Sequence, residues 1–218
     1  MIRPLAFAAL LALAGCGDPA PPAGSGANAT QAETKAAAAP LGDPVRIRLE
    51  TEAGPILLAL NHRRAPVTVE NFVAYVDQRR FDGTTFYRAA RQAGDPRHGF
   101  VQGGIRHTAR RALPQIAHEP TSRTGIRHLD ATISMARNAP GTAMGDFFIT
   151  VGPMPVMDEG GGRNADNQGF AAFGRVEQGM DAIRRILAAP TVPNAGRGGM
   201  RGQMIAAPVR IVSARRAD

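Results

Sequence analysis

Short segments of alternating apolar and polar residues, separated by turn residues, constrain the fold of this 218-residue chain more than any other feature. In VRIRLET, apolar Val45, Ile47 and Leu49 alternate with polar residues, which predicts a strand with one buried face. PILLAL follows across a turn at residues 52–54, and the two segments predict a hairpin. Further strands are predicted for TTFYRA, FVQGGI, TISMAR, DFFITV, FAAFGRV and APVRIVSA.

Two segments repeat their apolar residues at the spacing of a helix. The first begins at Pro66 and runs to about Arg80, and the second is EQGMDAIRRIL. Their apolar positions are Val69, Phe72, Val73 and Val76 in the first, and Met180, Ile183 and Leu187 in the second. The chain is therefore predicted to be mainly β, with about eight antiparallel strands closed into a barrel that two α-helices cap.

The N-terminal residues predict export from the cytoplasm. Arg3 precedes an apolar run from Leu5 to Ala14, which is too short to span a bilayer. The stretch LAGC resembles a bacterial lipobox, in which the cysteine is lipidated and becomes the mature N-terminus; here that residue is Cys16. An ordinary cleaved secretion signal is the alternative. Gly17, rather than Asp, follows the cysteine and favours the outer over the inner membrane.

Three segments follow from this interpretation. Residues 1–15 are predicted to be a lipoprotein-type signal peptide, and residues 16–43 a flexible tether rich in Ala, Pro and Gly. Residues 44–218 form the folded domain, on the periplasmic side of the cell envelope. Cys16 is the sole cysteine, so no intramolecular disulfide can form.

The charge of the chain does not predict a nucleic-acid partner. The net charge is +8 and the isoelectric point is 11.2, which by themselves favour a polyanion. Lys35 is, however, the only lysine, and the arginines are spread along the chain instead of gathering with aromatic residues. We therefore expect no nucleic-acid binding.

The common catalytic and metal-binding motifs are absent from the sequence. It contains no G-x-S-x-G, H-E-x-x-H or phosphate-binding loop. The 5 histidines show no recurring ligand spacing, and DEGGGRNADNQG lacks the ligand order of a calcium loop. We expect neither a metal site nor a cofactor. We interpret DEGGGRNADNQG, residues 158–169, as a loop.

A set of motifs in order along the chain resembles the cyclophilin family of peptidyl-prolyl cis/trans isomerases. The motifs are FYR, FVQGG, TISMAR, GDFFI, GFAAFGRV and EQGMDAI, and the resemblance extends from about Val45 to Ala214. It implies a closed antiparallel cyclophilin-like barrel, with proline-containing polypeptides as partners and no cofactor. We expect a monomer that accelerates X-Pro rotation while extracytoplasmic proteins fold. The alternatives are a catalytically weak peptide-binding module or chaperone in the envelope, and a scaffold for an envelope assembly.

The resemblance also implies roles for individual residues. Arg88 matches the family's catalytic arginine, and Gln102 the glutamine that bonds the substrate backbone and seats the arginine. The implied substrate-binding residues are Phe100, Met135, Ala136, Asp146, Phe148, Met157 and Phe170.

Several positions depart from the family's pattern. Asp146 stands where many members carry glutamine, Phe170 where many have histidine, and Val156 where tryptophan is common. Gly99 occupies a position where a pocket phenylalanine often stands. If Asp146 lies near Arg88, it either orients the guanidinium or partly neutralises it, and the sequence leaves both alternatives open.

Overall fold

The computed structural model describes residues 44–106 and 108–217. The predicted signal peptide, the tether and the lipidation site at Cys16 lie outside these residues. Among the described residues, no helix combines the length and apolarity needed to cross a membrane.

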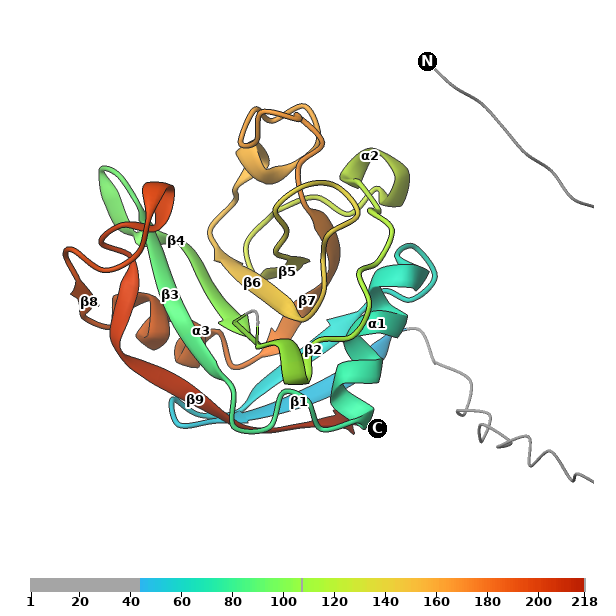
Figure 1. Cartoon of the computed structure of the whole chain (residues 1–218), viewed down its shortest axis with the longest axis horizontal. Coiled ribbons are helices and arrows are strands. Elements are labelled where there is room, and N and C mark those ends of the chain that lie inside the picture. The colour runs from blue at the N-terminus through green and yellow to red at the C-terminus, as the bar shows by residue number, and fades with distance from the viewer. Residues whose placement is uncertain (1–43, 107, 218) are drawn as a thin grey trace, which may run out of the picture. The chain divides into compact units, whose positions relative to one another are not determined.

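Eight antiparallel strands close into a barrel, as the sequence predicted (Figure 1). They follow the order β1-β2-β7-β5-β6-β4-β3-β9, and pairing of β1 with β9 closes the ring. A ninth, two-residue strand, β8, pairs with β9 outside the ring. The bounds are β1 Val45–Thr51, β2 Ile56–Leu60, β3 Thr85–Gln92, β4 Asp95–Gly104, β5 Thr132–Met135, β6 Asp146–Val151, β7 Ala171–Gln178, β8 Thr191–Val192 and β9 Met204–Ala217.

Two helices pack their apolar faces into the barrel core, and a third helix is a single turn. They are α1 Pro66–Asp77, α3 Met180–Ala188 and the short α2 Thr121–Thr124. The first helix ends a few residues before the predicted end, because Arg79 has a φ of 53°, outside the helical region. Three short 3-10 turns complete the described elements: η1 Ala109–Arg111, η2 Pro155–Met157 and η3 Gly198–Met200.

The barrel wall carries apolar residues on both faces where β4 and β6 pair. Phe147 and Ile149 belong to the core cluster inside the barrel, whereas Phe148 between them joins a second, smaller apolar cluster. Phe100 of β4 belongs to the same smaller cluster, and its neighbour Val101 faces the core. Alternation along each strand therefore gives the wall an outer apolar surface, and the candidate site is built on it.

Strand β3 contains a bulge at Tyr87. Phe86 lies opposite Gly103 and Arg88 opposite Gln102, so Tyr87 is an extra residue without its own partner on β4. Phe86 and Ala89 face the core cluster, while Tyr87 and Arg88 between them belong to neither core cluster. The bulge thus lets two consecutive side chains serve the outer face.

Candidate active site

An apolar pocket lies on the outer face of the barrel wall. Phe100, Phe148, Met157 and Phe170 line it, in a cavity of about 150 Å³. The ring of Phe148 packs against both Phe100 and Phe170, with centroids 5.3 Å apart in each pair. A cavity of about 150 Å³ accepts a benzene ring in other proteins, so one five-membered proline ring has room here.

Arg88 stands at the edge of this pocket with its guanidinium held by two amides. Its Nε donates to Oε1 of Gln203 and its Nη1 to Oε1 of Gln102, each at 2.9 Å. The guanidinium carbon lies 4.9 Å from the centroid of the Phe100 ring. Among the described residues, Nη2 makes no hydrogen bond, so donors remain for a ligand in the pocket.

Burial changes the acidity of Arg88 without removing its charge. Burial lowers the pKa of the guanidinium to about 10, and the positive charge of Arg163 contributes in the same direction. This pKa is still about three units above neutral pH, so the side chain remains a cation. A cation with free N–H groups next to an apolar pocket can donate charge-assisted hydrogen bonds to a bound peptide.

A chain of hydrogen bonds connects Arg88 to Asp146 through two intermediate side chains. Gln102 accepts from Arg88 and donates through Nε2 to the hydroxyl of Tyr87 at 2.8 Å. That hydroxyl donates to Oδ1 of Asp146 at 3.1 Å, and the same oxygen accepts the backbone N–H of Arg106 at 2.8 Å. Asp146 therefore contributes to orienting Arg88 through Tyr87 and Gln102. Burial and the nearby carboxylate raise the pKa of Tyr87, so the phenol stays protonated and able to donate.

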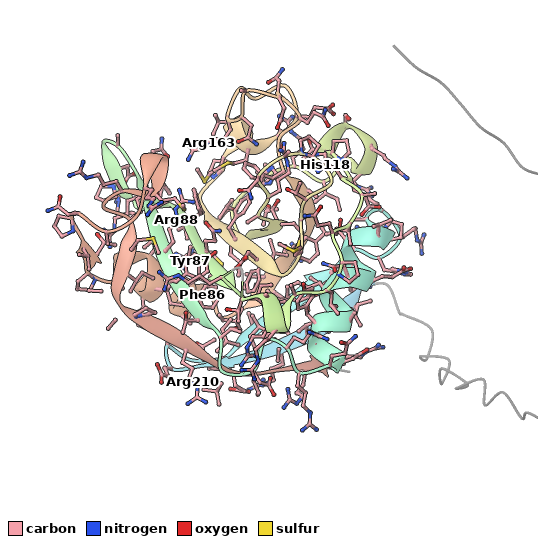
Figure 2. The ribbon with its side chains drawn as sticks, viewed as in Figure 1. Phe86, Tyr87, Arg88, His118, Arg163 and Arg210 are labelled. Atoms are coloured by element: carbon pink, nitrogen blue, oxygen red, sulfur yellow. The ribbon has the colours of Figure 1, made fainter. Side chains whose placement is uncertain are left out.

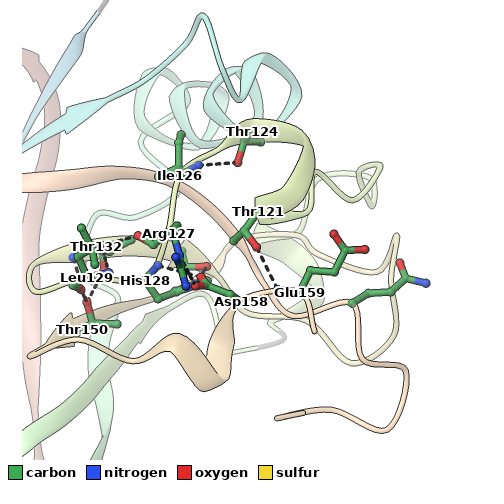
Figure 3. Close-up of polar contacts among 12 residues, drawn as sticks. Thr121, Thr124, Ile126, Arg127, His128, Leu129, Thr132, Thr150, Asp158 and Glu159 are labelled. Atoms are coloured by element: carbon green, nitrogen blue, oxygen red, sulfur yellow. Dashed lines mark hydrogen bonds and ion pairs between the residues drawn. The ribbon is translucent and has the colours of Figure 1, made fainter. Parts of the chain in front are cut away.

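Behind the pocket, a buried histidine supports Phe148. The His128 ring lies nearly parallel to the Phe148 ring, at 10° and 5.7 Å between centroids. Its Nδ1 lies 2.7 Å from Oδ1 of Asp158 (Figure 3). Its Nε2 lies 2.9 Å from Oγ of Ser134. Burial lowers the pKa of His128, although Asp158 opposes this, so the neutral ring donates from Nδ1 and accepts at Nε2. Ser134, His128 and Asp158 are the residue types of a hydrolase triad, but all three are buried. They therefore position the pocket floor and do not reach a substrate.

The loop of residues 158–169 is fastened to the end of β5 by an arginine. Arg137 forms a bidentate ion pair with Asp166, at 2.7 and 2.8 Å, and donates from Nε to the carbonyl of Gly169 at 2.8 Å. Its guanidinium also lies 5.4 Å from the Phe170 ring centroid. The sequence correctly predicted a loop here, and Arg137 brings it to the rim of the pocket.

Most of the predicted site residues meet in this single pocket. The lining includes Arg88, Gln102, Phe100, Ala136, Asp146, Phe148, Met157 and Phe170. Met135 is the exception and corrects one prediction: it is buried in the barrel core. The reason is strand parity, since its neighbours Ser134 and Ala136 face the pocket side and alternate residues of a strand point to opposite faces. Val156 lines the adjoining groove.

Several residues around the pocket were not predicted from the sequence. Tyr87 and Gln203 hold the Arg88–Gln102 pair, and His128 supports the floor. The lining also includes Asn138, Thr142, Met144, Arg163 and Met200. Tyr87 lies within the FYR motif, which was a signal for it, whereas Gln203 and His128 belong to none of the motifs. Among the described residues, no cluster of His, Cys, Asp and Glu could hold a metal ion.

Comparison with known proteins agrees with the family resemblance found in the sequence motifs. Residues 46–216 match the family described as cyclophilin-type peptidyl-prolyl cis-trans isomerase. The chain is 34% identical to peptidyl-prolyl cis-trans isomerase cyp18 of Streptomyces antibioticus, covering 69% of this chain and 87% of that protein. It is 37% identical to peptidyl-prolyl cis-trans isomerase A of Dickeya dadantii, covering 64% and 70%.

A solved structure has the same fold at lower sequence identity. It is a cyclophilin-type peptidyl-prolyl cis-trans isomerase of Cryptosporidium parvum, crystallised in the presence of the dipeptide Ala-Pro. It superimposes with a TM-score of 0.63 at 16% identity, covering 79% of this chain and 99% of that one. With the closed barrel, the outer pocket and the match over residues 46–216, the chain belongs to the cyclophilin-type peptidyl-prolyl cis-trans isomerases.

Proposed function

We propose that this isomerase acts on proline-containing polypeptides of the cell envelope, with Arg88 as its catalytic residue and a lipid on Cys16 as its anchor. The observation that carries the catalytic part is the position of Arg88, a cation with free N–H groups beside an apolar pocket of the right size for proline.

The chemistry requires no nucleophile. Rotation about an X-Pro bond faces a barrier of about 18 to 20 kcal/mol, because the nitrogen shares its lone pair with the carbonyl. The apolar pocket holds the proline ring while the preceding carbonyl rotates. In the twisted transition state the lone pair localises on nitrogen, where the Arg88 guanidinium donates a hydrogen bond that the planar ground state accepts poorly. Gln102 and Gln203 keep the guanidinium in place, so little reorganisation is needed.

The exchange rate of an X-Pro peptide measured by NMR tests this role of Arg88. We expect the full-length protein to accelerate exchange, and Arg88→Ala to reduce kcat/KM by at least about tenfold, which is about 1.4 kcal/mol. Arg97→Ala is the matched control, since it removes an exposed arginine of β4 that lines a different cavity. Peptide binding without acceleration would instead identify a receptor on an isomerase fold. Unchanged catalysis by Arg88→Ala would exclude Arg88 as the catalytic residue.

The envelope location rests on the sequence of residues 1–16. A short basic start, an apolar run and LAGC before the sole cysteine support processing at Cys16 and lipidation there. Mass spectrometry of the mature N-terminus tests this, with Cys16→Ser as the comparison. We expect a diacylglyceryl-modified Cys16 in the membrane fraction of the wild type. An unmodified N-terminus at another residue would leave an ordinary secretion signal as the explanation.

A further inference from the structure

Arg163 is a charged residue at the pocket that the isomerase chemistry does not require. It lies on the loop of residues 158–169 and lines both the proline pocket and the adjoining groove. Figure 2 shows it on this loop, with Arg88 below it in the view, on β3. Among the described residues, its guanidinium makes no hydrogen bond or ion pair, although most other charged groups near the pocket are paired.

Two of the three acidic residues on the loop of Arg163 are engaged with other side chains, and the third, Glu159, forms no ion pair with Arg163. Asp166 is held by Arg137, and Asp158 by His128 and Arg127. Asp146 accepts hydrogen bonds from Tyr87 and from the backbone of Arg106. Among the described residues, Arg163 therefore has no ion-pair partner on its own loop. Arg88 is held by neutral amides, so its positive charge is not neutralised either.

The two arginines are close enough to interact. The charge of Arg163 helps to lower the pKa of Arg88, which requires that its field reach the guanidinium across the pocket. Placing two like charges at one cavity is unfavourable unless an anion joins them. The loop that carries Arg163 is fastened by the Arg137–Asp166 pair, so the charge is held near the pocket by a defined contact.

We propose that Arg163 selects substrates that carry a carboxylate side chain on a residue next to the proline. This inference rests on the proposed isomerase function and adds a substrate class to it. The proline ring occupies the apolar pocket and the carboxylate of the flanking residue meets Arg163 at the mouth. Arg163 is a specificity residue in this scheme, since the rotating bond is served by Arg88.

Four blocked peptides test the selection in the full-length protein. Two carry Glu or Gln immediately before proline, and two carry Glu or Gln immediately after it, with acetyl and amide ends so that only the side chain is charged. We expect kcat/KM for one Glu peptide to exceed that of its Gln partner by about three- to tenfold at low ionic strength, as for a partly exposed ion pair. The pair that shows the preference identifies the side of proline that Arg163 reads.

Variants and salt separate a local charge effect from the overall positive charge of the chain. Arg163→Gln should reduce the ratio of kcat/KM for the Glu peptide to kcat/KM for the Gln peptide to about one. Arg163→Lys keeps the charge and should keep most of this ratio. Arg123→Gln, an exposed arginine of α2 outside the pocket lining, removes the same charge and should leave the ratio unchanged. Raising the salt to about 0.5 M should reduce the ratio in the wild type, because the Debye length shortens to about 4 Å.

The outcomes distinguish failure of the selection from failure of the isomerase function. Equal acceleration of Glu and Gln peptides, or the same loss of preference in Arg123→Gln, would overturn the selection and leave the isomerase intact. If no peptide is accelerated, the isomerase function fails. The dissociation constants of the same peptides, from chemical-shift titration, then still test the selection, and equal constants would overturn it.

Discussion

Tyr87 connects Gln102 to Asp146, although it belongs neither to the cavity lining nor to the barrel core cluster. Its hydroxyl accepts from Gln102 and donates to Asp146, so it uses both functions of a phenol. Removing the hydroxyl leaves a buried amide N–H and a buried carboxylate oxygen short of one partner each. Such losses cost about 1 to 3 kcal/mol.

We expect Tyr87→Phe to lower the free energy of unfolding by about 1 to 3 kcal/mol and to reduce kcat/KM by a few-fold, since Gln102 then holds Arg88 less firmly. Denaturant unfolding and peptide exchange measure the two effects. Tyr75→Phe is the control, because Tyr75, on α1, is the only other tyrosine of the sequence. Its hydroxyl accepts the N–H of Leu113 at 2.8 Å and makes no contact with Gln102 or Asp146 in the hydrogen bonds of the described residues. It should destabilise the fold without the catalytic loss; equal catalytic losses in both variants would contradict this role of Tyr87.

His128 gives the fold a dependence on pH. Burial lowers its pKa in the folded state, so between that value and the unfolded pKa of about 6.5 the unfolded chain binds a proton that the folded chain does not. The free energy of unfolding is therefore highest, as far as His128 is concerned, above about pH 6.5. It falls as the pH drops below this value, by up to about 1.4 kcal/mol per pH unit. Asp158 adds a separate loss at lower pH. Burial works to raise the Asp158 pKa, but bonds from His128 and Arg127 outweigh it and lower the value.

Urea unfolding at about pH 8 and about pH 5.5 measures this dependence. The wild type should lose stability at the lower pH. His128→Gln should be less stable at the higher pH but change less between the two, because no buried imidazole remains to be protonated. His118→Gln removes a histidine outside the buried network and should keep the wild-type difference. An unchanged difference in His128→Gln would exclude His128 as its source.

The sequence predicted the site where a motif fixed the residue, and failed where a contact between strands decided. Arg88 and Gln102 stand in motifs and were placed correctly in the pocket. Tyr87, next to Arg88, was missed because a bulge cannot be seen in a single strand's alternation. Met135 was misplaced for a different reason. It lies between Ser134 and Ala136, which face the pocket side, so the alternation of side chains along the strand places Met135 in the core.

At the scale of elements, the loop of residues 158–169 decides what surrounds the pocket mouth. It begins at Asp158, bonded to His128, and Thr121 of α2 accepts the N–H of Glu159 at 3.0 Å. Its far end is held by Arg137 through Asp166 and Gly169. The loop is thus fixed at both ends, with its exposed middle between them.

We expect Asp166→Asn to loosen the far end of this loop, because the bidentate ion pair is lost while the bond from Arg137 to Gly169 remains. Amide hydrogen exchange in residues 160–168 should rise by at least about threefold. The hydrogen bond from Arg137 lowers the pKa of Asp166 to about 2, so the wild-type contact persists above about pH 4 and is lost as the pH falls toward 2. Asp181→Asn, in an exposed pair on α3, should not change exchange in the loop. Unchanged exchange in Asp166→Asn would contradict the proposed fastening.

Elements with a strong pattern were predicted well. The strands around VRIRLET, FVQGG and DFFITV and both long helices appear where the sequence placed them. The short strand β8 and the single turn α2 were missed, because two to four residues carry no recognisable period. The last strand was predicted as APVRIVSA, but β9 runs from Met204 to Ala217, since pairing with β3 and β8 extends its start and pairing with β1 extends its end.

At the scale of the molecule, β9 closes the barrel. It pairs with β3, β8 and β1, and its last residues, from Ile211 to Ala217, supply the whole contact with β1. Arg215 and Arg216 of the same segment form ion pairs with Asp82 and Asp77. Much of the barrel's order thus depends on the C-terminal residues of the chain.

A chain that ends at Arg210 should fail to unfold cooperatively. It lacks the β1–β9 pairing, which exposes two sheet edges and the apolar core beneath Ile211 and Ala214. Thermal unfolding followed by circular dichroism measures this. A chain lacking only residues 217 and 218 keeps most of the pairing and should retain a sharp transition; a sharp transition in the shorter chain would show that the ring closes without this pairing.

Strands β3, β4 and β6 form a wall one backbone thick, with the core on one side and the outer pocket on the other. A shift of β6 by one residue in register would turn Phe148 inward and Phe147 outward. The register of the strand therefore matters as much as the identity of its residues. In β3, a deletion of Tyr87 should leave Phe86, Arg88 and Ala89 in strict alternation, so Arg88 would still face outward, although the hydroxyl between Gln102 and Asp146 would be lost. At this bulge, loss of one residue therefore removes a hydrogen-bonding side chain without reversing the two faces of the wall.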